Sequence, residues 1–382
     1  MNESSYKKVR YTFKCKTVTP LLNYGATYKE ILPRTASLKG MIRYWWRVIK
    51  PLISNKSFLT AEKLLQEEIK LFGGINEKND TAIKSPVKVS IDRIKKFKEK
   101  FYSNDGLIKS LITRNPYFYG TFNVTLNGKI GDYKTRQQSV TKRIISPEQW
   151  DEILFSTHVS LLLGGLGKRS RRGFGSIEII NNEKKDINVR DYILSFFKYY
   201  KSKFPELNYT HEEILTDDMD YKYKKFDLIC FNRKGRTNHS FLKAIWIGPQ
   251  EYTQNNKLIE LLTKINHAKR KLYSSINDKQ IIQEVLGCVY IHTRDTEKTC
   301  ECFRRDVSYK NKKRYASQLW VKIFKINNQL VPIYIYLCPS SSTVCDRSRT
   351  CNEQTSSNFN HCYDAIHRDH LKVIKEFIKN SQ

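Results

Sequence analysis

Residues 161–180 read LLLGGLGKRSRRGFGSIEII: an apolar run, a loop with five glycines, four cations and no acid, and then a strand-like pattern. Glycine lets the backbone adopt positive φ angles and come close to a ligand. Backbone N–H groups in such a loop form anion-binding concavities, and arginine adds a planar fork suited to phosphate. The stretch therefore predicts a loop that grips a phosphate backbone, placed between a helix and the last strand of a sheet.

The spacing of these glycines excludes two common nucleotide-binding loops. No Lys-Ser/Thr pair follows the last glycine, so the Walker A pattern is absent. The loop precedes a strand instead of opening a helix, which excludes a Rossmann turn. Nucleotide hydrolysis is therefore disfavoured, and the alternative to a phosphate grip is a mobile basic loop.

The segments before the loop predict alternating strands and helices. Period-two alternation predicts strands over residues 11–18, 86–91 and 117–126. Helices are predicted over residues 38–49, 60–72 and 147–163. Ser37 is the expected cap of the first helix, Gly73-Gly74 closes the second, and Asn127-Gly128 is a hairpin turn signal. With the strand at 176–180, the order β-α-α-β-β-α-β favours a ferredoxin-like sandwich, the layout of RNA-recognition motifs.

The remainder of the chain predicts a second module. The polar break 181–186 marks a domain boundary, so the expected domains are 1–180 and 181–382. Helices are expected over 191–200 and 255–273, and strands over 284–294 and 318–337 with a turn at Asn327-Asn328. The predicted fold class is α+β, with two ferredoxin-like (RRM-like) modules, the first carrying the glycine-rich loop before its last strand.

Composition points to a polyanionic partner. Lys and Arg number 68 against 38 Asp and Glu, a formal net charge of +30, which concerns partners more than fold. An apolar fraction of 40% is enough to build a core. Neither an apolar N-terminal segment nor a run of about 18 apolar residues is visible, so we expect a cytoplasmic protein with no membrane partner. Its nine cysteines are then expected to be reduced.

A longer motif in the first helix carries a family resemblance. Residues 34–47, RTASLKGMIRYWWR, resemble the Arg-x-x-Ser-x-x-Gly-x-x-Arg-x-Trp-Trp-Arg signature of the first subunit of type III-B (Cmr) CRISPR effectors, within the RAMP superfamily. Thr19-Pro20-Leu21, Leu71–Gly74 and the glycine-rich loop are similar to further landmarks of that family. Leu286-Gly287 and Arg314–Ser317 resemble its second-domain landmarks. The interior of 185–280 matches no landmark, and the extension after Cys338 departs from the family pattern.

The resemblance implies a non-catalytic RNA-binding subunit with two RRM-like modules and no cofactor. Such a subunit sits at the head of the effector near the 3′ end of the guide RNA and helps to capture target RNA. The implied partners are guide CRISPR RNA, single-stranded target RNA and the other subunits of a Cmr-type complex. Backbone cleavage belongs to another subunit of that complex.

On the first helix, Lys39, Arg43 and Arg47 recur at i, i+4 and i+8 and share a face, which predicts a cationic ladder for phosphates. The alternative is a solvated helix face. Trp45 and Trp46 are expected in the core, because adjacent helix positions cannot both face one ligand. The residues predicted to contact RNA are Arg34, Ser37, Lys39, Gly40, Arg43, Arg47, Gly165, Gly167, Lys168, Arg169, Ser170, Arg171, Arg172, Gly173, Phe174 and Gly175.

Two other functions stay open at this point. A metal-independent endoribonuclease that processes CRISPR repeat RNA would need a general base, for which His158 and His292 are candidates, although a packed histidine is the commoner case. A basic structural protein would meet only protein neighbours. No catalytic residue is assigned.

A zinc site is not predicted. The soft ligands in the last third of the chain include no Cys-x2-Cys pair, so reduced thiols are the favoured interpretation. These residues are Cys300, Cys302, Cys338, Cys345, Cys351, Cys362, His361, His367 and His370.

Overall fold

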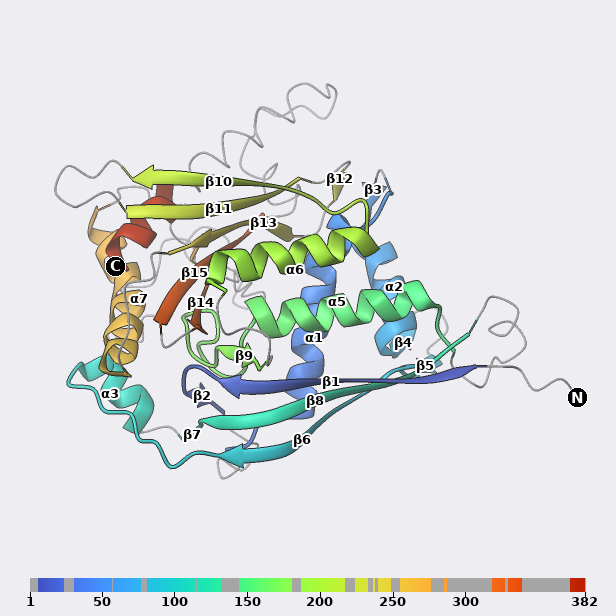
Figure 1. Cartoon of the computed structure of the whole chain (residues 1–382), viewed down its shortest axis with the longest axis horizontal. Coiled ribbons are helices and arrows are strands. Elements are labelled where there is room, and N and C mark those ends of the chain that lie inside the picture. The colour runs from blue at the N-terminus through green and yellow to red at the C-terminus, as the bar shows by residue number, and fades with distance from the viewer. Residues whose placement is uncertain are drawn as a thin grey trace, which may run out of the picture.

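Helices lie between two antiparallel sheets in this α+β fold (Figure 1). The computed structural model describes residues 6–23, 31–56, 58–76, 81–113, 116–131, 144–180, 187–216, 224–232, 236–237, 240–248, 255–275, 285–286, 318–326, 329–338 and 372–381 of the 382. In these parts of the chain no helix is both long enough and apolar enough to cross a membrane.

The first sheet has the strand order β6-β8-β1-β9, and all its pairs are antiparallel. Its strands are β1 (Lys7–Thr17), β6 (Lys88–Lys96), β8 (Gly120–Ile130) and β9 (Ile177–Ile179). Two helices cover one face, α1 (Thr35–Ile49) after β1 and α5 (Pro147–Leu163) after β8. Because side chains alternate along a strand, Phe13 and Cys15 of β1 are buried beneath the helices while Lys8, Arg10 and Lys14 point to the other face and are exposed.

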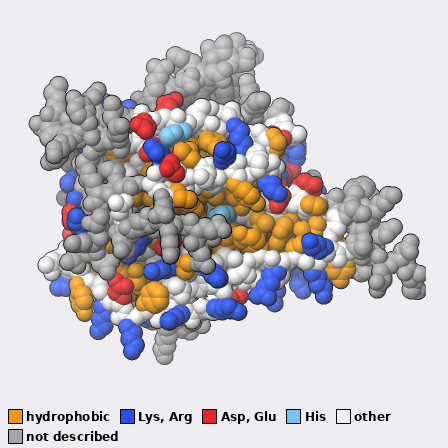
Figure 2. All heavy atoms as spheres, viewed as in Figure 1, with side chains coloured by type: hydrophobic (Ala, Val, Ile, Leu, Met, Phe, Trp, Pro, Cys, Tyr) orange, Lys and Arg blue, Asp and Glu red, His pale blue; other side chains and the backbone are white. Residues whose placement is uncertain are grey.

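Smaller elements surround this sheet. Strand β2 (Leu21–Leu22) precedes α1, and α1 is followed by a 3-10 turn, η1, and by a helix α2 that packs on α1. These elements are η1 (Lys50–Leu52), β3 (Phe58–Leu59), α2 (Ala61–Phe72), β4 (Gly74–Asn76), β5 (Thr81–Ile83), α3 (Gly106–Thr113) and β7 (Tyr117–Phe118). In the space-filling view, Lys and Arg side chains follow the lower margin of the molecule, over the first sheet (Figure 2).

The second sheet has five strands in the order β10-β11-β13-β15-β14, all antiparallel. They are β10 (Asn208–Thr216), β11 (Lys224–Asn232), β13 (Phe241–Ile247), β14 (Leu319–Ile326) and β15 (Gln329–Cys338). Helix α6 (Val189–Lys203) precedes the sheet and α7 (Asn255–Ser275) follows β13, while the short β12 (Arg236–Thr237) pairs with β3. Strands β13, β14 and β15 are buried almost throughout, as expected for continuous apolar runs between two covering layers.

Helix ends follow local chemistry where side chains cap them. Ser146 and Gln149 form a capping box at the start of α5, and Thr60 caps α2 by accepting from the N–H of Lys63. Gly73, at φ +76°, ends α2. The end of α2 at Gly73 confirms the prediction, whereas the two caps were not predicted. The expected cap of α1 is wrong: the helix begins at Thr35 with Arg34 at the N-cap, so Ser37 lies exposed within the first turn.

The predicted hairpin turn at Asn127-Gly128 is also wrong. Strand β8 continues to Ile130, with Asn127 paired to both Arg10 and Lys88. A Cβ at Gly128 would lie 3.0 Å from the Trp150 ring, so this glycine serves the close packing of α5 on the sheet. The glycine at position 128 is therefore required by helix-sheet packing and not by a turn.

In the second half the two predicted helices and the final strand pair are confirmed, and Ile326 of β14 stands opposite Gln329 of β15. The predicted turn residues Asn327 and Asn328 lie outside the described residues. The strand predicted over 284–294 is not found where it can be checked, because Val285 and Leu286 are helical; the rest of that segment and the boundary at 181–186 lie outside the described residues. Both apolar clusters of the core draw on both halves of the chain: one joins Phe13 to Ile335, and the other joins Phe174 to Leu262.

Candidate nucleic-acid interface

The cationic face of α1 is built around a buried carboxylate on α2. The Arg43 Nε lies 2.5 Å from Oε1 of Glu68, and the Arg47 Nη1 lies 2.6 Å from Oε2 of the same residue. The Glu68 side chain is fully buried, whereas the two arginine side chains are each about a third exposed. One carboxylate therefore fixes two guanidinium groups on adjacent helical turns and leaves part of each facing solvent.

Glu68 belongs to this candidate site, and the sequence interpretation missed it. The three cations were expected to repel one another until phosphates lay across them, but Glu68 already neutralises part of that charge. A signal exists in the sequence: Glu68 falls on the apolar stripe that Leu64, Leu71 and Phe72 define on α2, and a carboxylate on a buried stripe is rarely left unpaired.

A basic groove of about 570 Å³ lies beside this pair, between α1, the end of α2 and the strands β5 and β6. Four cations line it: Lys39, Arg43, Lys84 and Lys88. Gly73 shapes its floor, because a Cβ there would lie 2.6 Å from the backbone N of Ser85. Among the predicted site residues of α1, Arg34, Ser37 and Gly40 are exposed and Lys39 is half-buried.

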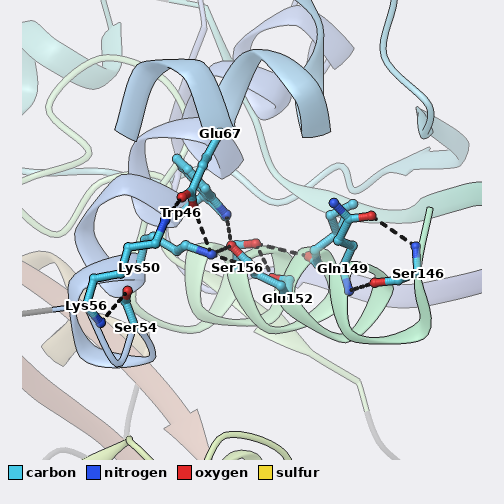
Figure 3. A network of polar contacts seen from close by, with 10 residues as sticks. Trp46, Lys50, Ser54, Lys56, Glu67, Ser146, Gln149, Glu152 and Ser156 are labelled. Atoms are coloured by element: carbon cyan, nitrogen blue, oxygen red, sulfur yellow. Dashed lines mark hydrogen bonds and ion pairs between the residues drawn. The ribbon is translucent and has the colours of Figure 1, made fainter. Parts of the chain in front are cut away.

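A second charged network fixes the other end of α1 to α5 (Figure 3). The Trp46 indole N–H donates to Glu152 Oε1 at 2.5 Å, and Lys50 Nζ lies 2.8 Å from the same oxygen. Lys50 also reaches Glu67 at 3.2 Å. Burial lowers the pKa of Lys50, but attraction to Glu152 and Glu67 outweighs it, so the pKa lies above its usual value. Trp45 and Trp46 are both fully buried, which confirms their core role.

The backbone of the glycine-rich loop is held mainly by the protein itself. The N–H groups of Lys168 and Gly175 donate to the carbonyls of Leu22 and Pro20, and the N–H of Gly173 donates to the carbonyl of Val321. Gly167, Gly173 and Gly175 have positive φ angles, and a Cβ on Gly175 would lie 1.8 Å from the Leu166 carbonyl oxygen. The N–H groups of the loop were expected to form a concavity for an anion. Those of Lys168, Gly173 and Gly175 instead donate to carbonyl oxygens of the protein.

Exposure divides the predicted loop residues into two groups. Gly165, Gly173, Phe174 and Gly175 are buried, and the Phe174 ring packs in the core, so its predicted RNA contact is corrected to an anchoring role. Gly167, Lys168 and Arg169 form an exposed tip, flanked by the half-buried Ser170, Arg171 and Arg172. Only the tip and its flanks offer side chains to a ligand.

The arginines that flank the tip contact other parts of the chain. The Arg171 guanidinium lies 4.6 Å from the centre of the Trp320 ring and 5.9 Å from that of Tyr44. Arg172 donates to the carbonyl of Leu286 at 3.0 Å, and Arg169 to Asn266 Oδ1 at 3.3 Å. The loop is therefore stacked between α1 and the second sheet. It meets α1 through Tyr44 and Trp45, and Tyr44 feels the positive charge of both Arg171 and Arg47.

His158, the candidate base of the ribonuclease alternative, is packed among aromatic rings. Its ring lies 4.6 Å from Phe196 and 5.4 Å from Phe13, centre to centre, and Nδ1 is 3.4 Å from the Tyr200 hydroxyl. This environment fits a packing role. The other candidate, His292, lies outside the described residues, as do all the zinc candidates except Cys338, which is buried. Where side chains are described, no cluster of three or more potential metal ligands occurs.

Comparison with known proteins places the first sheet and its helices in a known class. Residues 14–178 match the family model of the RAMP superfamily. This part of the chain, from β1 to β9, is similar to the RAMP superfamily.

A curated relative narrows the class. The chain is homologous to the CRISPR system Cmr subunit Cmr1-2 of Pyrococcus furiosus, with 28% identity over 181 residues that cover 44% of this chain and 93% of the relative. Among solved structures, the apo crystal structure of Cmr1 from Pyrococcus furiosus aligns with a TM-score of 0.46 and 18% identity, over 94% of this chain and 96% of that one. A type III-B Cmr-beta structure bound to cognate target RNA and AMPPnP aligns with a TM-score of 0.48 and 14% identity, over 96% and 100%.

Proposed function

We propose that this chain is a non-catalytic RNA-binding subunit of a type III-B CRISPR effector complex that acts in antiviral defence. It contacts the 3′ region of the guide RNA, captures single-stranded target RNA, or does both, and it assembles with the other subunits of the complex. The RAMP-superfamily match and the homology to a Cmr subunit support the assignment. The observation that carries the RNA-binding role is the arginine pair held by Glu68 at the basic groove.

The physical argument begins with preorganisation. Arginine binds phosphate best when its planar fork is already oriented, because less side-chain freedom is then lost on binding. Glu68 takes one nitrogen of each guanidinium, and each guanidinium has five N–H donors in all. The remaining N–H groups of Arg43 and Arg47 have no other hydrogen-bond partner in the described parts of the chain. They are available to backbone phosphates that lie along the groove with Lys39, Lys84 and Lys88.

The other predicted contacts form a second part of the same proposal. Gly167, Lys168 and Arg169 at the loop tip, with Ser170, meet RNA from the exposed side, while Arg171 and Arg172 position the loop. Arg34, Ser37, Gly40 and Arg47 extend the contact along α1.

We also propose that the first module is ferredoxin-like and the second is a related RRM-like module. The connectivity β1-α1-β6-β8-α5-β9 and the strand order β6-β8-β1-β9 support the first assignment. The helix-sheet composition of the second half supports the second.

A charge-neutral double variant tests the groove. Arg43→Gln with Glu68→Gln removes one cation and its partner, so the net charge of the chain does not change. We expect weaker binding of labelled single-stranded RNA, and a fall of about 0.7 in the slope of log affinity against log salt for each lost phosphate contact. Asp151→Asn with Lys203→Gln, a surface ion pair on α5 and α6, is the matched control. Wild-type affinity and salt slope in the first variant would refute the groove assignment.

The non-catalytic part of the proposal has its own test. Purified chain incubated with labelled repeat RNA and with single-stranded RNA, with and without divalent metal, is expected to leave both intact. Cleavage that His158→Phe abolishes would replace the proposal by the ribonuclease alternative.

A further inference from the structure

The face of the first sheet that points away from α1 and α5 carries a row of cations. We use the name open face for the outward positions of β1 (8–14), β8 (123–129) and β6 (88–92). Lys8, Arg10 and Lys14 of β1 and Lys88 of β6 are exposed there, and Lys129 of β8 is half-buried. Figure 2 shows Lys and Arg side chains along this margin of the molecule.

The open face has little to neutralise these charges. Its one acid, Asp92, accepts from Thr125 Oγ1 at 3.0 Å. Lys8, Arg10, Lys14 and Lys88 make no ion pair with any residue that the structure describes. Lys8 stands directly opposite Lys129, an arrangement of like charges that destabilises a sheet. The row therefore has an electrostatic cost in the free protein that an anion would relieve.

The spacing of the row suits a chain of phosphates. Outward positions on one strand are two residues apart, about 6.6 Å, and neighbouring strands are about 4.8 Å apart. Cations at successive outward positions can therefore meet successive phosphates of an extended single strand. Besides Asp92 and the buried Thr125, whose hydroxyl donates to Asp92, the remaining outward positions hold Thr12, Ser90, Asn123 and Asn127, residue types that can donate hydrogen bonds to phosphate and sugar oxygens.

The chemistry of the open face disfavours a protein occupant. Protein interfaces have an apolar or aromatic centre from which lysine is depleted, and no apolar or aromatic residue stands at the outward positions that define the open face. Two rings lie beside it: the centre of the Tyr6 ring is 4.7 Å from Lys129 Nζ, and that of Phe97 is 5.8 Å from Lys16 Nζ. Strand addition is disfavoured as well, because the edge strand β6 has an irregular register after Asp92, with Arg93 at φ +49°. Both rings lie against lysines beside the face, whereas an RNA-recognition sheet that reads bases carries its stacking rings on the central strands.

The open face is continuous with the basic groove. Lys88 lines the groove and also lies on the edge strand of the open face, where it shares Asn127 as a neighbour with Arg10. A strand that leaves the groove therefore passes over β6 onto β8 and β1.

We propose that the open face binds the sugar-phosphate backbone of a single-stranded nucleic acid without reading its bases. The proposal rests on the proposed function only for the choice of RNA as that strand. It adds a second contact surface, separate from the loop tip and from the Arg43–Arg47 pair.

A salt titration of the full chain tests the open face. The variant Lys8→Gln, Arg10→Gln, Lys14→Gln removes three cations, and Lys198→Gln, Lys372→Gln, Lys375→Gln removes three exposed cations from α6 and the C-terminal helix as the control. The probes are labelled oligouridylate and oligoadenylate of equal length. We expect the slope of log affinity against log salt to fall by about 2 for the open-face variant with both probes, and less for the control. Unchanged thermal unfolding shows that the variant is folded.

Each contrary result has a defined meaning. If the open-face variant has the same RNA affinity and salt slope as the control while the Arg43/Glu68 variant binds RNA more weakly, the groove assignment is supported and the open-face proposal is wrong. If the loss differs between the two oligonucleotides, the face reads bases and the proposal is wrong. If the variant keeps RNA affinity but loses assembly with the other subunits, the occupant is an acidic protein surface. If the wild-type chain binds neither probe, the proposed function and this inference fall together.

Discussion

No contact within the folded chain requires a glycine at position 40. It lies exposed in the interior of α1, and a Cβ added there would meet nothing within 4 Å. Glycine at such a position destabilises a helix by about 0.5–1 kcal/mol relative to alanine. This contrasts with Gly175, where a Cβ would strike the Leu166 carbonyl. A glycine without an internal role on the cationic helix suits the close approach of a ligand backbone.

Replacing Gly40 separates stability from binding. Gly40→Ala is expected to raise the free energy of unfolding by about 0.5–1 kcal/mol, since only helix propensity changes. If RNA passes over this turn, the same variant binds RNA more weakly than wild type. Urea unfolding and RNA titration of one preparation measure both effects. A variant that gains stability and keeps full RNA affinity would remove Gly40 from the proposed interface.

Glu67 predicts a response to acid. Burial raises the pKa of this carboxyl, but hydrogen bonding to Lys56 and the charge of Lys50 outweigh it, so the pKa lies below its usual 4.5. A depressed pKa in the folded state means stability that is present above 4.5 and is lost as pH falls through the folded-state pKa.

The matching measurement is urea unfolding at a series of pH values from 6 down to about 3. Glu67→Gln is expected to flatten the loss of stability below the usual carboxyl pKa, whereas the exposed Glu206→Gln leaves the acid limb unchanged. An acid limb of wild-type steepness in Glu67→Gln would show that this ion pair does not contribute to acid stability.

At the scale of elements, local signals and tertiary contacts gave different kinds of information. The apolar period of the helices and the glycine that ends α2 predicted those elements well, because these signals lie within a few turns of the chain. The prediction of a turn at Asn127-Gly128 was wrong because Gly128 packs against the ring of Trp150. Trp150 lies 22 positions further along the chain, outside the short stretch of sequence from which a turn is predicted. The glycine-rich loop was placed correctly between α5 and β9, but its role was only partly predicted. The partners of Arg171 and Arg172 come from β14 and from Leu286, far away in sequence.

Arg171, whose guanidinium stacks on Trp320 and Tyr44, is expected to stabilise the position of the glycine-rich loop. Arg171→Lys keeps the charge but loses the planar group that lies over Trp320 and Tyr44. We expect the free energy of unfolding to fall by about 0.5–2 kcal/mol. Arg10→Lys on the exposed face of β1 is the control and is expected to change little. Wild-type stability together with lost RNA binding would instead make Arg171 a direct ligand contact.

At the scale of the whole molecule, the two halves share their interior. Strand β14 accepts a backbone hydrogen bond from Gly173 and donates one from Val321 to the carbonyl of Arg171. Lys322, almost fully buried, reaches from β14 to the carbonyl of Leu161 at the end of α5. The second half therefore completes the packing of the first sheet and its helices.

A shared interior predicts cooperative unfolding. We expect one urea transition for the full chain, with tryptophan fluorescence and far-UV circular dichroism giving the same midpoint. Tryptophans in both halves, Trp45 and Trp320 among them, are buried, so fluorescence reports on both. Two separated transitions would show that the predicted domains 1–180 and 181–382 fold independently.

The sequence by itself determined the α+β class, helices α1, α2, α5, α6 and α7, the strands of the first sheet and the β14–β15 pair, but not α3 or the strands β10, β11 and β13. It also determined the excess of positive charge and the two segments, 34–47 and 161–175, around which a binding site was proposed. These properties depend on composition and on patterns among residues that are close in the chain, such as the apolar period of a helix or the glycine that ends it. Only the tertiary structure showed that Glu68 holds Arg43 and Arg47, that the loop arginines lie against the second half, and that the cations of β1 and β6 share an open face. Those facts depend on strand register and helix packing, which join residues that are distant in the chain.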